Sequence, residues 1–366
     1  MAKQPAWRNP RTINVAIIGV MMVVLVEILW RLIAPISTPP FRDKDGGAIA
    51  GSIAVVERWP VNGVTQTVVI RGRNQANPLL VWLHGDGLCE TPDLRLYNSV
   101  LEDHFTVVYW CQRHAGQSFD PFAAPPKTLT IDQYVADLEV VVDLVRARFH
   151  QDKVVLVGHS WGTVLGVLYT ERHPEKVAAY LGVSQVVNSL ESERRSYAYV
   201  LAVAQARKDA KLVDRIRKLG PPPRPDGTIY TPRAWLQATG GLFHADMSNR
   251  TLALMAARSS EANWRDVAGF LGGAEKDFAP VLPEVRGLTL DIGHTEFAAP
   301  VFFLSGRYDH TTDAALAHSY FERVVAPRKE FVWFDQSAHS PPFEEPARFN
   351  DWIITHVRPL ATGPSR

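Results

Sequence analysis

The chain has 366 residues, of which 46% are hydrophobic and 21% are charged, and its formal net charge is +1. This length is enough for one large α/β domain with an insertion, or for two modest domains, and for a substantial buried core. Acidic and basic residues are mixed along the chain, so we expect no nucleic-acid partner, because such partners select clustered positive charge.

The N-terminal segment differs from the rest of the chain. Residues 1–12 carry several basic side chains, and residues 13–34 then form a nearly continuous apolar stretch that contains Glu27 and Arg31. We expect a transmembrane anchor at 13–34, with these two charges pairing or reaching the interface. A cleaved signal peptide is the alternative, although no small-x-small cleavage site follows. The basic residues before the span favour a single-pass membrane protein with its folded domain on the extracytoplasmic side.

Residues 35–51 are rich in proline and glycine and predict a linker. The first part of the folded core is expected at residues 52–185. It opens with two β-rich runs joined by Asn62 and Gly63, a strong hairpin signal. Three short apolar runs without alternation follow, which is typical of strands buried on both faces of a parallel sheet. These runs are residues 79–83, 106–110 and 154–157.

The two cysteines, Cys89 and Cys111, each follow one of these strands. The strands would be neighbours in the predicted sheet, so a single disulfide is geometrically possible. We favour two unpaired thiols, and two cysteines are too few for a disulfide-rich scaffold or a cysteine zinc site.

The second half of the chain continues the alternation of strands and helices. It resumes at residues 177–183 and again over residues 300–358, which we expect to form the second part of the core, with residues 359–366 as a tail. Residues 186–299 break the alternation with charged helix formers and predict a helical cap. The whole pattern indicates the α/β class, with a mostly parallel, doubly wound sheet. A cap beyond the carboxyl ends of the strands would shape a ligand pocket.

The sharpest functional signal is the G-x-S-x-G pentapeptide at residues 158–162 (GHSWG), between an apolar strand and a helix. Small residues at both glycine positions allow a tight turn that lifts the Ser160 hydroxyl clear of the sheet. The N-terminus of the following helix favours negative charge that develops beside it. We therefore predict that Ser160 is a nucleophile; otherwise the segment is a small-residue turn at a strand end.

A serine nucleophile needs a base, which a carboxylate orients. Asp309 follows the strand predicted at 300–304, and His339 follows the strand that ends at Phe334. Both should lie on loops at the same sheet edge as Ser160, and we predict a catalytic triad of these three residues. The weaker rivals are Asp313, Asp335, His310 and His318.

An oxyanion intermediate needs two backbone N–H donors. We expect them from Trp161 and, in the loop at residues 84–87 (HGDG), from Asp86, whose carboxylate should turn away. His84 is interpreted as a structural histidine. This chemistry requires neither a metal ion nor an organic cofactor.

Taken together, these segments resemble the proline iminopeptidase branch of the α/β-hydrolase fold, the S33-type peptidases. The resemblance extends over about residues 68–349 and implies a serine hydrolase with a helical cap. The matching segments are residues 84–87 (HGDG) for the HGGPG loop of the family, 112–118 (QRHAGQS) for DQRGxGxS, 160–163 (SWGT) for the SWG helix, and 306–309 (GRYD) and 337–340 (SAHS) for the acid and the histidine.

The chain also departs from the family pattern, at Asp86, Cys111, His114 and His159. Family members that remove an N-terminal residue hold the free amine of the substrate with carboxylates of the cap. The resemblance therefore implies Glu191 or Glu193 as substrate-binding residues, although a solvated helix surface is the alternative that we favour for both.

Our leading hypothesis is a proline-iminopeptidase-like aminopeptidase that acts on short peptides through an acyl-enzyme. An esterase or amidase for small acyl substrates is the second, with the same triad. A non-catalytic binding protein of the same fold is the third, and the intact set of three residues argues against it. The sequence leaves the oligomeric state open.

Overall fold

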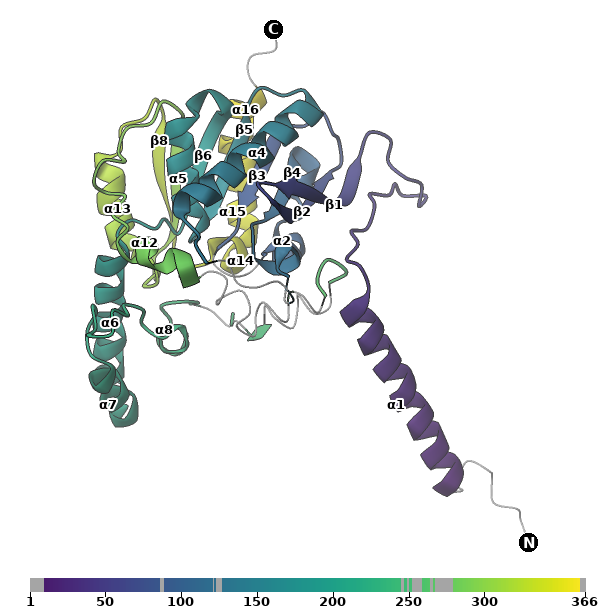
Figure 1. Cartoon of the computed structure of the whole chain (residues 1–366), viewed down its shortest axis with the longest axis horizontal. Helices are drawn as coiled ribbons and strands as arrows, with labels where there is room; N and C mark the ends of the chain where they lie inside the picture. The colour runs from purple at the N-terminus through teal and green to yellow at the C-terminus, as the bar shows by residue number, and fades with distance from the viewer. Residues whose placement is uncertain are drawn as a thin grey trace.

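The computed structural model describes residues 10–85, 89–120, 122, 127–244, 247–248, 250–251, 259–263, 266 and 279–362. The strands are β1 (Ile53–Val61), β2 (Val64–Gly72), β3 (Leu79–Leu83), β4 (Thr106–Cys111), β5 (Val154–His159), β6 (Val177–Val183), β7 (Val301–Gly306) and β8 (Lys329–Phe334). They form one sheet in the order β1-β2-β4-β3-β5-β6-β7-β8 (Figure 1). Pairing is antiparallel between β1 and β2 and between β2 and β4, and parallel elsewhere. The predicted α/β class with a mostly parallel sheet is confirmed.

The strands form where the sequence has continuous apolar runs. Every residue of β3, β4, β5, β6 and β7 is buried, as expected for strands that are covered on both faces. The hairpin between β1 and β2 turns at Asn62 and Gly63, whose φ angles are 44° and 84°. Two positive φ angles in succession are what a two-residue hairpin turn of this type requires.

Helices cover both faces of the sheet (Figure 1). Leu138, Val164 and Tyr320 belong to one buried cluster, and Leu94 and Phe349 belong to the cluster on the other face. The helices of the first face are α4 (Ile131–Phe149), α5 (Gly162–Arg172) and α13 (Ala314–Arg323); α2 (Thr91–Asn98), α3 (Leu101–His104), α14 (Pro341–Glu344), α15 (Pro346–His356) and α16 (Arg358–Thr362) complete the core. The segment expected as a tail therefore begins as the short helix α16.

The segment between β6 and β7 contains further helices within the residues predicted to form a cap. They are α6 (Ser189–Ala206), α7 (Ala210–Leu219), α8 (Arg233–Thr239) and α12 (Leu282–Arg286). Short 3-10 turns occur at Gly116–Ser118, Pro174–Lys176 and Ala279–Val281. Helices α6 to α8 have a small apolar core of their own, which includes Val200, Ile216 and Leu236, and they extend beyond one end of the sheet (Figure 1).

Helix α1 (Pro10–Ile33) leads away from the rest of the molecule (Figure 1). The prediction of a transmembrane anchor at 13–34 is corrected: within the described part of the chain, no helix combines the length and the hydropathy that a membrane crossing demands. The run without charge between Arg11 and Glu27 is residues 12–26, shorter than the roughly 20 apolar residues that a span needs. The single-pass location inferred from this anchor is likewise unsupported.

Candidate active site

Ser160 stands on a sharp turn between β5 and α5. Its φ angle is 52°, a conformation that is uncommon for a residue with a side chain. The turn is possible because glycines flank it: a Cβ on Gly158 would lie 2.6 Å from the Gly162 carbonyl oxygen, and a Cβ on Gly162 would lie 2.0 Å from the Leu83 carbonyl oxygen. The Ser160 N–H donates to the Val183 carbonyl at 3.0 Å, which ties the turn to β6.

The structure brings together the three side chains that the sequence singled out. His339 Nε2 lies 3.0 Å from Ser160 Oγ, and His339 Nδ1 lies 3.0 Å from Asp309 Oδ2. All three come from loops that follow the carboxyl ends of β5, β7 and β8. The imidazole therefore has a hydroxyl on one side and a carboxylate on the other, the arrangement in which it can accept the serine proton.

Asp309 is held by several donors. Its Oδ1 accepts from the N–H groups of Thr311 at 2.8 Å and Thr312 at 3.1 Å, and its Oδ2 accepts from Thr312 Oγ1 at 2.8 Å. Burial alone would raise the pKa of this carboxyl, but the charge and hydrogen bond of His339 and the bonds from Thr312 hold the pKa well below its usual range. Asp309 therefore stays ionised.

The rival residues have other partners. Asp313 caps α13, accepting from Leu316 N at 2.8 Å, and Asp335 pairs with an arginine at the surface. His310 stacks on a tyrosine of α6, and His318 stacks on a tryptophan of β8.

Of the two expected oxyanion donors, Trp161 lies among the described residues. Trp161 directly follows Ser160 and is buried, and its indole N–H donates to Gln112 Oε1 at 2.9 Å. Asp86 lies outside the described residues. Gly85, just before it, runs close over the turn, since a Cβ at Gly85 would lie 3.5 Å from the Ser160 Cβ.

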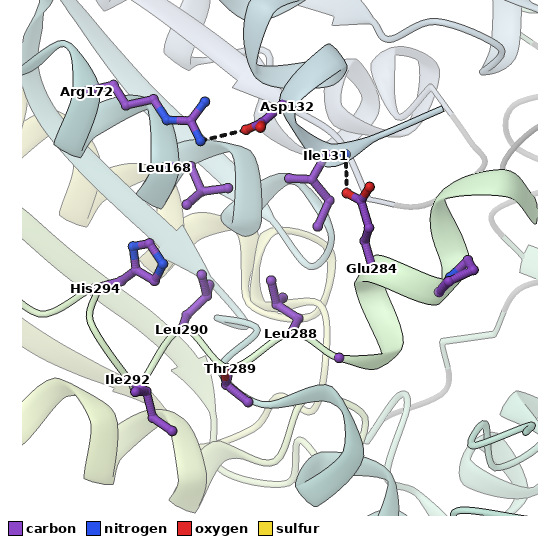
Figure 2. A pocket seen from close by; sticks show the side chains of 12 residues that line it. Ile131, Asp132, Leu168, Arg172, Glu284, Leu288, Thr289, Leu290, Ile292 and His294 are labelled. Carbon is purple, nitrogen blue, oxygen red and sulfur yellow. Dashed lines mark hydrogen bonds and ion pairs between the residues drawn. The ribbon is translucent and has the colours of Figure 1, made fainter. Parts of the chain in front are cut away.

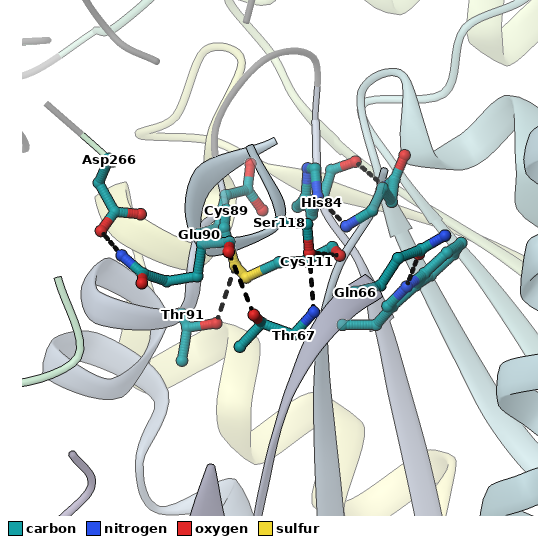
Figure 3. The surroundings of a disulfide bond; sticks show 12 residues. Gln66, Thr67, His84, Cys89, Glu90, Thr91, Cys111, Ser118 and Asp266 are labelled. Atoms are coloured by element: carbon teal, nitrogen blue, oxygen red, sulfur yellow. Dashed lines mark hydrogen bonds between the residues drawn. A yellow bond between two sulfur atoms is a disulfide. The ribbon is translucent and has the colours of Figure 1, made fainter. Parts of the chain in front are cut away.

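His84 has two backbone partners, as a structural histidine should. Its Nδ1 donates to the Gly85 carbonyl at 2.6 Å, and its Nε2 accepts from the Gln112 N–H at 2.9 Å. Cys89 and Cys111 form a disulfide (Figure 3), so the expectation of two unpaired thiols was wrong. The ends of β3 and β4 are adjacent in the sheet, and the bridge fastens the loop after β3 to the end of β4.

A glutamate that the sequence did not indicate, Glu90, follows Cys89. Its Oε1 lies 2.6 Å from His159 Nδ1, and its Oε2 accepts from Trp82 Nε1 at 2.8 Å. Burial alone would raise the pKa of Glu90, but His159 beside it lowers the pKa below the usual value. No motif marks this glutamate; the neighbouring positions of β3 and β5 in the sheet are the signal that could have indicated it.

The two carboxylates that could bind the substrate amine form ion pairs with arginines. Glu193 Oε1 lies 2.7 Å from Arg233 Nη2, and its Oε2 accepts from the Thr231 N–H at 2.7 Å. Glu191 pairs with Arg195 at 2.9 Å. The structure places neither carboxylate in contact with the Ser160, His339 and Asp309 set.

A separate cavity of about 540 Å³ lies between the start of α4, the end of α5 and the segment after α12 (Figure 2). Leu168, Leu288 and Leu290 line it together with the Asp132–Arg172 ion pair, which spans 2.6 Å. Of the predicted site residues that the structure describes, none lines this cavity. Among the described residues, no group of three or more histidine, cysteine or acidic side chains could hold a metal ion.

Comparison with known proteins identifies the family of this fold. The sequence model of the alpha/beta hydrolase fold family matches residues 78–346. A Bacillus subtilis (strain 168) protein named probable aminopeptidase YbaC is 29% identical over 310 residues, 84% of this chain and 97% of that protein.

Two solved structures share the fold. The proline iminopeptidase of Mycobacterium smegmatis has a TM-score of 0.59 at 18% identity and covers 84% of this chain and 99% of its own. A proline iminopeptidase-related protein from Thermus thermophilus has a TM-score of 0.60 at 18% identity, with coverage of 85% and 99%. The resemblance to the proline iminopeptidases that the sequence indicated is thus confirmed as a similarity.

Proposed function

Because the chain belongs to the alpha/beta hydrolase fold family, we propose that it is a serine hydrolase in which Ser160, His339 and Asp309 carry the reaction. The observation that carries this proposal is the position of the His339 ring, 3.0 Å from Ser160 Oγ and 3.0 Å from Asp309 Oδ2. A fold alone hosts many functions, so the argument rests on this constellation.

In the proposed mechanism, His339 Nε2 takes the hydroxyl proton as Ser160 Oγ attacks the substrate carbonyl. Asp309 accepts from Nδ1, which keeps Nε2 free to act as the base and stabilises the imidazolium that forms. The Trp161 N–H and an N–H of the loop at residues 84–87 stabilise the oxyanion. Collapse expels the amine or alcohol, which takes the proton from His339, and water then cleaves the acyl-enzyme by the same steps.

For the substrate, we propose short peptides cleaved at the N-terminal residue. The similarity to a protein named as an aminopeptidase over nearly all of its length supports this choice. An esterase or amidase is the second candidate, and one observation favours it. Glu191 and Glu193 are neutralised by arginines, so neither carboxylate is available to hold the free amine of a peptide.

The test compares prolyl- and alanyl-naphthylamides with p-nitrophenyl esters on the full chain, with Ser160→Ala as the control. We expect turnover of the amides by the wild type and none by the variant, together with labelling by a fluorophosphonate only where Ser160 is present. Turnover of esters without amides would reject the peptidase proposal. An unlabelled wild type that is silent on both series would reject the hydrolase proposal and favour a binding protein.

A further inference from the structure

A second histidine and carboxylate pair lies beside the proposed active site, with its histidine ring 5.3 Å from the ring of His339. We propose that Glu90 and His159 act together as a positioning pair, which holds the backbone of His339 and the loop after β3 in register with the Ser160 turn. This inference rests on the proposed function. Neither residue would touch the substrate.

The contacts of Glu90 join three parts of the site. One carboxylate receives His159 Nδ1 at 2.6 Å, Trp82 Nε1 at 2.8 Å and, more weakly, the Gly85 N–H at 3.3 Å. Trp82 belongs to β3, Gly85 to the loop expected to supply an oxyanion donor, and His159 to the end of β5, just before Ser160. The disulfide at Cys89 anchors the residue next to this carboxylate (Figure 3).

The hydrogen bonds of His159 determine how many protons the pair must hold. His159 Nε2 lies 3.0 Å from the His339 carbonyl oxygen, and a carbonyl can only accept, so Nε2 carries a proton. Nδ1 faces the Glu90 carboxylate, and that short contact needs a second proton between them. The pair is therefore an imidazolium beside a carboxylate, or its equivalent with the second proton shared.

Electrostatics agree with this count of protons. His159 is only 4% exposed, and burial alone would lower its pKa; the Glu90 carboxylate and the His339 carbonyl raise the pKa above the usual value. Among the described residues, the other titratable groups that interact with the pair are His84, Asp93, Asp309 and His339. A neutral His159 would turn the lone pair of its unprotonated nitrogen toward an acceptor, so one of its two contacts would become repulsive.

The consequence for His339 is that hydrogen bonds to its carbonyl hold its backbone in place. Its carbonyl accepts from His159 Nε2 and from Ser184 Oγ, the latter at 2.8 Å, while its ring bridges Ser160 and Asp309. Loss of the His159 bond would remove one of the two hydrogen bonds to this carbonyl and allow the ring to shift. Small displacements of a base are costly to rate, because the geometry of proton transfer is demanding.

The test uses the full chain with Glu90→Gln, His159→Gln and the double variant. The matched control is Glu171→Gln, because Glu171 and His294 also form a pair at 2.6 Å but lie away from the proposed site. We expect kcat and the rate of fluorophosphonate inactivation to fall about 10- to 100-fold in each site variant, with KM within about twofold and the control unchanged. The double variant should resemble the single ones, because the residues act as a unit.

The pH profile separates positioning from mere stability. Because the pKa of His159 is raised, the ring keeps its second proton to a higher pH than an ordinary histidine and loses it as the pH rises further, so the wild type should lose activity on the alkaline side. This alkaline limb should move to lower pH in Glu90→Gln and disappear in His159→Gln. Folded variants with an unchanged kcat and an unchanged profile would overturn the proposal, even if their melting temperatures fall.

A spectroscopic readout needs neither a site variant nor turnover. It therefore still tests the pair if the site variants fail to fold. In Glu171→Gln labelled with ¹⁵N-histidine, we expect one histidine ring that remains doubly protonated at pH 8. If every ring is neutral at that pH, the positioning pair is wrong. If the wild type hydrolyses nothing and is not labelled by the fluorophosphonate, the proposed function fails, while the NMR result still decides whether the pair exists.

Discussion

Replacing Asp309 by Asn tests how the carboxylate controls the protonation of His339. The N–H groups of Thr311 and Thr312 both point at Oδ1, so the amide oxygen of Asn should take that position. The amide nitrogen then replaces Oδ2, which lies 3.0 Å from His339 Nδ1. Because this nitrogen donates, Nδ1 must accept, and the ring proton moves to Nε2. Nε2 can then no longer accept the proton of Ser160.

The expected loss follows from this change of tautomer. We expect kcat to fall about 10⁴-fold, which corresponds to about 5.5 kcal/mol in the activation free energy. KM should change little, because Asp309 is buried and would not touch the substrate. The assay measures kcat and KM of the full chain on the best substrate of the naphthylamide and ester panel, together with the rate of fluorophosphonate labelling.

The matched control is Asp313→Asn, four residues further along. Asp313 caps α13, and asparagine caps a helix as well as aspartate does, so this variant should keep the activity of the wild type. An Asp309→Asn variant that retains a tenth or more of the wild-type kcat would show that the carboxylate does not set the tautomer of His339. The mechanism would then need a different acid.

Three further predictions concern stability. Gly162→Ala would place a Cβ 2.0 Å from the Leu83 carbonyl oxygen, so we expect a loss of about 4 kcal/mol or more in urea unfolding; a loss below about 1 kcal/mol would contradict the packing of the turn. Replacing Cys89 by Ser breaks the bridge to Cys111, which spans 22 residues of sequence, and should cost about 3 kcal/mol; a reductant should lower the melting temperature of the wild type but not of the variant. Burial, and then neighbouring carboxylates, raise the pKa of Asp93 to about 7, so the folded state binds more protons than the unfolded state between about pH 4 and 7. The stability of the wild type should therefore fall as the pH rises through this range. In thermal melts at pH 5 and pH 8, the melting temperature of Asp93→Asn should fall less than that of the wild type.

Much of the sheet could be predicted because its strands are apolar on both faces. The runs expected at 79–83, 106–110 and 154–157 correspond to β3, β4 and β5 to within two residues. The positions of Ser160, Asp309 and His339 followed from one rule, that side chains on loops after parallel strands gather at the same edge. That rule needs the order of the strands but none of their side-chain contacts.

The errors arose where the outcome depends on contacts between distant segments. Cys89 and Cys111 could be placed after adjacent strands, but whether their sulfur atoms meet depends on the course of the loop after β3. The same loop brings Glu90 to His159, a contact between residues 69 positions apart. Glu193 was judged a surface or substrate residue, and its burial against Arg233 depends on how the helices of the cap pack.

One short segment after α8 ties the proposed cap to both loops of the site. The Gly241 carbonyl accepts from the His310 N–H at 3.1 Å, and the Leu242 carbonyl accepts from the His339 N–H at 3.1 Å. Two residues of the cap thus hold the loop of the acid and the loop of the base at once. If the cap moved away as a rigid body, both loops would lose these bonds and His339 would lose its place between Ser160 and Asp309. We therefore expect any opening that admits substrate to hinge outside residues 241–242 and to leave this segment seated on the core.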